Sequence, residues 1–149
     1  MTGIIIRPLQ MEDRSAWEGL WQTYLTFYEQ KLAQEVTETL FGRLLADGHH
    51  AGLVAELDGT LVGFAHYLVH DSTWSITPTC YLEDLFVDGA IRGGGIGRRL
   101  IEGVYTAADN AGCGNVYWHT HDHNSRARKL YDRIGTLSAF VRYDRPKAD

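Results

Sequence analysis

Residues 87–100 read VDGAIRGGGIGRRL, so an apolar strand leads directly into a glycine-rich loop and then into a basic, amphipathic helix. Glycine has no Cβ, and several backbone N–H groups of such a loop can therefore point at one anion. The amino end of the following helix adds a partial positive charge, and Arg98 and Arg99 add full ones. The pattern predicts a phosphate-binding loop.

The spacing of the glycines excludes two better-known phosphate loops. The chain has no G-x-x-x-x-G-K-[ST], and G-x-G-x-x-G fails because Leu100 stands where the third glycine is needed. A turn that only needs positive φ angles would not require an arginine on each side of the loop. What the loop does match is R-x-x-G-x-G, at Arg92, Gly95 and Gly97.

That match resembles the acetyl-CoA pyrophosphate loop of the GCN5-related N-acetyltransferases (GNAT), whose motif is [QR]-x-x-G-x-[GA]. Two further stretches are similar to the same superfamily and follow its order. Residues 81–87, YLEDLFV, resemble its fourth strand, and residues 124–131, NSRARKLY, resemble its N-x-x-A-x-x-[LF]-Y helix. Three motifs in the expected order are a more specific signal than the loop alone.

Length and composition agree with one soluble domain. The 149 residues, 44% of them hydrophobic, are enough for a single core, so we expect one GNAT domain over residues 1–149. A net charge of −5 argues against nucleic acid as a partner. No apolar run reaches the length of a membrane span, and residues 1–4 lack a signal-peptide layout, so we expect a cytoplasmic protein without a membrane partner. Cys80 and Cys113 form neither a disulfide framework nor a C-x-x-C site.

Hydrophobic periodicity predicts an alternation of strands and helices along the chain. Asp58-Gly59 is a strong hairpin signal between two apolar runs. The strands are expected at residues 4–8, 53–57, 61–69, 81–87, 116–120 and 139–143, and the helices at 13–28, 36–46, 96–111 and 124–134. The resemblance implies an α/β (α+β) GNAT fold, a mixed six- to seven-stranded sheet that is splayed between its fourth and fifth strands and flanked by about four helices.

The resemblance also implies where acetyl-CoA binds. In the superfamily, pantetheine pairs with the main chain of the fourth strand, backbone amides of the glycine loop hold the pyrophosphate, and an asparagine contacts the pantetheine arm. The matching positions here are Leu85, Phe86, Val87, Arg92, Gly93, Gly94, Gly95, Ile96, Gly97, Arg98 and Asn124.

Acyl transfer to an amine needs a neutral nucleophile, a polarised thioester and a proton for the departing thiolate. Tyr131 matches the general acid of the superfamily, and a hydroxyl with a pKa near 10 can protonate a thiolate. The competing interpretation is that Tyr131 belongs to the core, because it lies on the apolar stripe of its helix.

Glu83 and Asp84 are consecutive in an otherwise apolar strand, so their side chains should point to opposite faces. At least one should then enter the core or line a cavity, unless the strand ends at the surface. The Glu-Asp pair resembles the spermidine/spermine N-acetyltransferases and their thialysine-acetylating relatives, where the Glu position contacts the amine. Glu83 is therefore the candidate for amine binding and for deprotonation, directly or through water, and Asp84 is a second substrate-binding candidate.

Three more side chains are candidates for the acceptor pocket: Tyr24, Phe27 and His119. The superfamily builds this pocket partly from the first helical region, although we expect Trp17 and Trp21 on the same stripe to be core. The run His119 to His123 has histidines at alternate positions that could in principle hold a metal. We expect no metal, because the family places this strand beside the cofactor.

The sequence therefore predicts an acetyl-CoA-dependent N-acetyltransferase whose acceptor amine attacks the thioester directly. The expected acceptor is a small primary amine, such as a polyamine or a lysine-like compound. The alternatives are a protein lysine or N-terminus as acceptor, and a non-catalytic CoA-binding module. Gly135-Thr136 replaces the frequent Gly-Phe of the family, which leaves the acceptor side open. The oligomeric state is also open, with a homodimer among the states considered.

Overall fold

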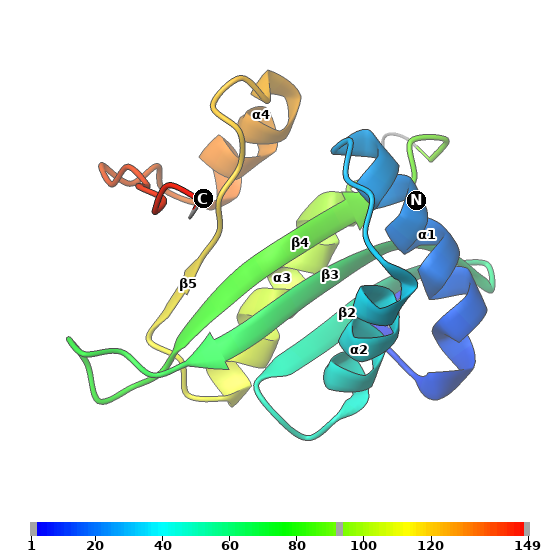
Figure 1. Cartoon of the computed structure of the whole chain (residues 1–149), viewed down its shortest axis with the longest axis horizontal. Helices are drawn as coiled ribbons and strands as arrows, with labels where there is room; N and C mark the ends of the chain where they lie inside the picture. The colour runs from blue at the N-terminus through cyan, green and yellow to red at the C-terminus, as the bar shows by residue number, and fades with distance from the viewer. Residues whose placement is uncertain (1–2, 92–93, 148–149) are drawn as a thin grey trace. The chain divides into compact units, whose positions relative to one another are not determined.

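The computed structural model describes residues 3–91 and 94–147. The chain divides into two compact units, residues 1–119 and residues 120–149. The first unit contains the sheet with three α-helices, and the second contains one helix (Figure 1). Within the described ranges, no helix combines the length and the apolar character needed to cross a membrane.

The sheet of the first unit has five strands in the order β1-β2-β3-β4-β5. The first four pair antiparallel, and β4 pairs with β5 in parallel. Asp58 and Gly59, with φ of 50° and 86°, make the turn between β2 and β3, which confirms the predicted hairpin. The strands are β1 (Ile4–Pro8), β2 (His50–Leu57), β3 (Thr60–His70), β4 (Thr79–Val87) and β5 (Asn115–Tyr117).

Helices cover both faces of this sheet. A 3₁₀ turn, η1 (Met11–Asp13), leads into α1 (Arg14–Phe27), which lies with α2 (Gln34–Leu45) on one face, while α3 (Ile96–Asn110) lies on the other (Figure 1). Consecutive residues of β3 show the two faces. Phe64 joins the core under α1 and α2, whereas a Cβ on Gly63 would lie 3.3 Å from Leu100 of α3 and 2.7 Å from the Phe86 carbonyl oxygen. Gly63 therefore allows the close approach of β3 to its neighbours.

The core under α1 and α2 is built around aromatic side chains. Trp17 is fully buried and stacks on Trp21 at 6.0 Å between ring centroids. Both tryptophans therefore lie in the core, as predicted. The remaining buried members of this cluster are Leu9, Leu25, Phe41, Leu44, Val54 and Phe64.

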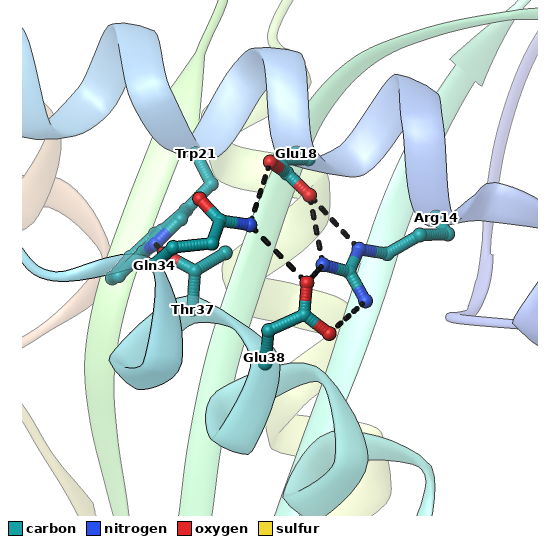
Figure 2. A network of polar contacts seen from close by, with 6 residues as sticks. All are labelled: Arg14, Glu18, Trp21, Gln34, Thr37 and Glu38. Atoms are coloured by element: carbon teal, nitrogen blue, oxygen red, sulfur yellow. Dashed lines mark hydrogen bonds and ion pairs between the residues drawn. The ribbon is translucent and has the colours of Figure 1, made fainter.

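A polar network joins α1 to α2 above this core (Figure 2). The Arg14 guanidinium donates to the carboxylates of Glu18 and Glu38, and the Gln34 amide donates to both carboxylates as well. Exposed ion pairs of this kind add little to stability, but several that share partners fix the orientation of the two helices.

The sheet opens between β4 and β5. Only Thr79, Cys80 and Tyr81 of β4 pair with β5, which ends at Tyr117. Among the described strands, residues 82–87 of β4 therefore have no partner on that side, in agreement with the predicted splay.

The second unit contains α4 (Ser125–Ile134), and Asn124 caps it by accepting a hydrogen bond from the Ala127 N–H at 3.4 Å. The predicted strand at residues 139–143 is wrong, because this segment has no regular structure and Phe140 and Tyr143 are 85% and 92% exposed. The sheet accordingly has five described strands instead of six to seven. An apolar pattern gives a propensity for strand, but a strand also needs an edge with which to pair.

Candidate active site

The glycine loop ends in an open helix amino terminus. Gly95 has a left-handed φ of 65° and precedes α3, whose first hydrogen bond runs from the Arg99 N–H to the Gly95 carbonyl at 3.0 Å. The N–H groups of Ile96, Gly97 and Arg98 thus have no acceptor within the helix. Such a terminus suits an anion. The predicted residues Arg92 and Gly93 lie outside the described residues.

The two arginines after the loop have different surroundings. Arg98 is exposed and lies 3.7 Å from the carboxylate of Glu102, one turn along α3. Arg99 instead donates to the main-chain carbonyl of Ile4 at 3.0 Å, which ties α3 to β1. Arg98 is therefore the arginine whose charge remains at the surface near the loop, while Arg99 contributes to the packing of the fold.

The predicted pantetheine-binding residues Leu85, Phe86 and Val87 form the end of β4 and are half-buried. Their main chain lies on the part of β4 that β5 does not reach. The Phe86 ring packs against Phe64 and Tyr24, at 5.7 and 6.0 Å between centroids. The side chains therefore serve the core, while the backbone edge is open to an added extended chain.

A β-bulge separates the two acidic residues of β4. Tyr67 of β3 pairs with Leu82, and the preceding residue, His66, pairs with Asp84, so Glu83 is the extra residue between them. Because paired residues share a face of the sheet, the bulge turns Asp84 to the face covered by α1. The Glu83 side chain is exposed, whereas that of Asp84 is only 17% exposed.

Asp84 lies at the centre of a hydrogen-bond chain that the sequence analysis missed. Its Oδ2 lies 3.0 Å from Nδ1 of His66, and its Oδ1 accepts from the Tyr24 hydroxyl at 2.9 Å. Nε2 of His66 in turn lies 2.9 Å from the indole nitrogen of Trp17. His66 is 3% exposed, and its sequence signal was a single polar residue within the apolar run of β3.

The charge of Asp84 affects the tyrosines beside it. Burial raises the pKa of Tyr24 far above its usual value, and the Asp84 carboxylate raises it further. Burial and the same carboxylate also raise the pKa of Tyr28. Tyr24 is therefore a hydroxyl donor throughout the physiological range. Among the described residues, Asp84 has no lysine or arginine partner, and its side-chain partners are His66 and Tyr24.

The other predicted acceptor residues lie elsewhere. Phe27 is 68% exposed at the end of α1 and packs edge-on against Tyr28. His119 follows β5, with Nδ1 at 3.2 Å from the hydroxyl of Tyr81, on the paired part of β4. The structure therefore brings Tyr24 and Asp84 together and places His119 in a separate group with Tyr81 and Tyr117.

Asn124 and Tyr131 belong to the second unit. Besides capping α4, Asn124 donates to the Thr120 hydroxyl at 3.4 Å. Tyr131 is half-buried on the stripe of α4 that its spacing predicted. The rings of His121 and His123 lie 5.4 Å apart, yet within residues 3–91 and 94–147 no three His, Cys, Asp or Glu side chains are placed to hold a metal ion.

A shallow groove of about 600 Å³ lies on another side of α1, lined in part by Arg7, Asp13 and Glu56. These three charged groups satisfy one another, since the Arg7 guanidinium bonds Asp13 at 2.8 Å and Glu56 at 3.2 Å. The hydrogen bond from Arg7 lowers the pKa of Asp13. These three charges are therefore paired with one another, whereas Asp84 has no lysine or arginine partner among the described residues.

The sequence resembles known proteins over most of its length. The sequence matches the acetyltransferase (GNAT) family over residues 14–136. It is 35% identical to the D-amino-acid N-acetyltransferase HPA3 of Saccharomyces cerevisiae over 145 residues, which cover 95% of this chain and 90% of that protein. It is also 37% identical to the thialysine N-epsilon-acetyltransferase of Bos taurus over 75 residues, which cover 50% of this chain and 44% of that one.

Solved structures share the fold. The aminoglycoside N-acetyltransferase AAC(6')-Iy, solved with a bisubstrate analogue, superposes with a TM-score of 0.85 over 97% of this chain and 99% of its own, at 24% identity. The chain belongs to the GNAT family of acetyltransferases. It is an N-acetyltransferase acting on amines, which disfavours the non-catalytic alternative.

Proposed function

We propose that this protein transfers the acetyl group of acetyl-CoA to the primary amine of a small, amino-acid-like molecule by direct attack. The observation behind the proposal is that β4 combines an open backbone edge at residues 85–87 with a carboxylate, Asp84, that has no lysine or arginine partner among the described residues. The first feature suits the thioester substrate, and the second suits a cationic amine.

On the cofactor side, the backbone of Leu85, Phe86 and Val87 would pair with pantetheine. The N–H groups at the start of α3 would hold the pyrophosphate, with Arg98 adding charge. Bound there, acetyl-CoA supplies an activated acetyl thioester. Arg92, Gly93, Gly94 and Asn124 complete this proposed set on the strength of the motifs.

On the acceptor side, Asp84 would bind the protonated amine and Glu83 would remove its proton, directly or through water. The free amine then attacks the thioester carbon, the C–S bond breaks, and Tyr131 gives its proton to the departing sulfur. The role of Tyr131 is supported by its match to the family motif. Phe27 and His119 stay as predicted lining residues of the acceptor pocket.

The relatives support a small amine as the acceptor. One is named for D-amino acids and another for thialysine, and both acceptors carry an ammonium group at neutral pH. Among the predicted acceptors, these names favour a lysine-like or amino-acid amine over a polyamine. A protein lysine or N-terminus is the competing acceptor.

The test is turnover with acetyl-CoA against a matched panel. D- and L-amino acids, thialysine, polyamines and basic peptides would be compared for the wild type and for Glu83→Gln. We expect the amino-acid amines to give the highest kcat/KM and Glu83→Gln to lower it. Efficient acetylation of peptides alone, or small-amine turnover that is indifferent to Glu83→Gln, would contradict the proposal.

The proposal treats residues 1–149 as one GNAT domain, because the family match runs through both compact units. A cytoplasmic location and a homodimer remain predictions. Light scattering of the purified protein would decide between monomer and dimer, and fractionation of expressing cells would test the location.

A further inference from the structure

We propose that His66 is a positioning residue for the acceptor-binding carboxylate Asp84, and that Trp17 holds His66 in the one tautomer able to fill this role. The inference rests on the proposed function, in which Asp84 binds the cationic amine. It adds two residues, from α1 and β3, that the family motifs do not contain.

The first step is the tautomer of His66. An indole N–H can only donate, so Nε2 of His66, at 2.9 Å from the Trp17 nitrogen, must accept and carries no proton. The single proton of the neutral ring is therefore on Nδ1, which donates to Oδ2 of Asp84 at 3.0 Å. In a doubly protonated ring, the Nε2–H of His66 would face the indole N–H of Trp17, and neither group could accept a hydrogen bond.

The second step is that the ring is held in place by its neighbours. It lies nearly parallel to the Phe64 ring, at 4.4 Å between centroids and 17° between planes. Trp17 and Trp21 lie at 5.8 and 5.4 Å. A ring flip would put a carbon atom against Asp84, and these contacts in a buried site oppose it.

The third step concerns what the chain does to Asp84. Its two oxygens receive one hydrogen bond each, from His66 and from Tyr24, and both donors are neutral. The carboxylate is thereby oriented without losing its charge. The chain ends at a donor-only indole, so no proton can pass from Asp84 through His66 to another acceptor. Asp84 is thus a fixed anchor for a cation, which leaves deprotonation to Glu83.

Two variants of His66 separate this role from simple packing. In His66→Asn, the amide nitrogen lies near the place of Nδ1 and keeps a donor for Asp84, but the partner of Trp17 is lost. In His66→Gln, the longer side chain keeps an acceptor for Trp17, but the donor to Asp84 is lost. Both substituted side chains are neutral amides. If His66 had only a structural role, the change in amine KM in each variant would therefore follow the change in its stability.

Steady-state kinetics with an amine that the wild type acetylates would give the readout. We expect His66→Gln to raise the KM for the amine by about tenfold, the loss of one charge-assisted hydrogen bond. His66→Asn should raise it by no more than about threefold, because one such donor remains. The KM for acetyl-CoA should be unchanged in both. Equal amine KM values in the two variants, or KM changes that follow melting temperature, would overturn the inference.

A ¹⁵N NMR spectrum of the His66 ring gives a second test that needs no substrate. We expect the Nδ1–H tautomer in the wild type, and a shift towards Nε2–H in Trp17→Phe, which removes the indole donor but keeps an aromatic ring. An Nε2–H tautomer in the wild type would overturn the inference whatever the kinetics. A wild type that acetylates no amine would overturn the proposed function instead, and the tautomer would still be measured.

Discussion

The acceptor side and the cofactor side of the candidate site are built in different ways. Around Asp84, the site consists of side chains from three elements, and one of them, Trp17, is also at the centre of the core. At the start of α3, the site consists of consecutive backbone N–H groups, and a Cβ on Gly95 would meet no atom within 4 Å. Changes on the acceptor side should therefore cost stability, whereas changes in the loop should cost binding with little effect on the core.

The largest expected effect is on the acceptor side, from Trp17→Ala. Trp17 is 0% exposed, stacks on Trp21 and donates to His66, so its removal leaves a large cavity. We expect the free energy of unfolding to fall by about 3–5 kcal/mol, measured by urea denaturation. The matched control is Met11→Ala, at a side chain that is 72% exposed. A loss as small as that of the control would mean that the acceptor side is not part of the core.

A change outside both regions comes next. Tyr131→Phe keeps the ring on α4 but removes the proposed proton donor. Turnover should fall about a hundredfold, or about 2.7 kcal/mol in activation free energy, while stability and acetyl-CoA affinity stay the same. Tyr143→Phe, at an exposed tyrosine of the same unit, is the control. Wild-type turnover in Tyr131→Phe would assign the hydroxyl to packing alone.

The loop is tested by Gly95→Val. The valine would put a branched side chain where the phosphate should lie, and we expect CoA affinity by calorimetry to fall about tenfold or more, at least about 1.4 kcal/mol. Gly112→Val is a matched control, because Gly112 also has a left-handed φ, 77°, and open space, but follows the other end of α3. Both substitutions place a valine at a left-handed φ, so equal CoA affinities in the two variants would refute the loop assignment.

The smallest effect should come from the contact between α1 and α2 that is drawn in Figure 2. The buried Thr37 hydroxyl accepts from the Trp21 indole at 3.2 Å, so Thr37→Val leaves that N–H without its acceptor. We expect a loss of about 1 kcal/mol in the free energy of unfolding. Thr39→Val changes an exposed residue of the same helix in the same way. Similar losses in the two variants would mean that the buried hydrogen bond adds nothing.

The same contrast explains how much could be predicted from the sequence. The glycine loop, the Asp58-Gly59 turn and the Asn124 cap each depend on a few consecutive residues, so their chemistry is visible in the chain itself. The Trp17–His66–Asp84 chain depends on three separated segments, and no local pattern contains it. The polar residue in the apolar run of β3 was the available signal, and its partners became visible only with the fold.

The acidic pair shows a second limit of prediction. Alternation along β4 correctly placed Glu83 and Asp84 in different surroundings. Which of the two faces α1, however, depends on the register of β4 with β3. This register contains a bulge that the sequence of β4 alone does not predict. The missing strand at residues 139–143 has a similar cause, because pairing depends on an available edge as well as on composition.

The extra residue at Glu83 shifts the alternation of side chains between the two faces of β4 by one residue. On either side of Glu83, side chains alternate between the two faces with a period of two, but the two alternating series are offset by one residue. Deleting Glu83 would restore a single phase along β4 and keep Asp84 opposite His66 on the face of α1, because Leu82 and Asp84 already pair with the consecutive residues Tyr67 and His66. A comparison with a strand that lacks this extra residue therefore needs a one-residue gap at Glu83, because an ungapped alignment would equate side chains on opposite faces of the sheet.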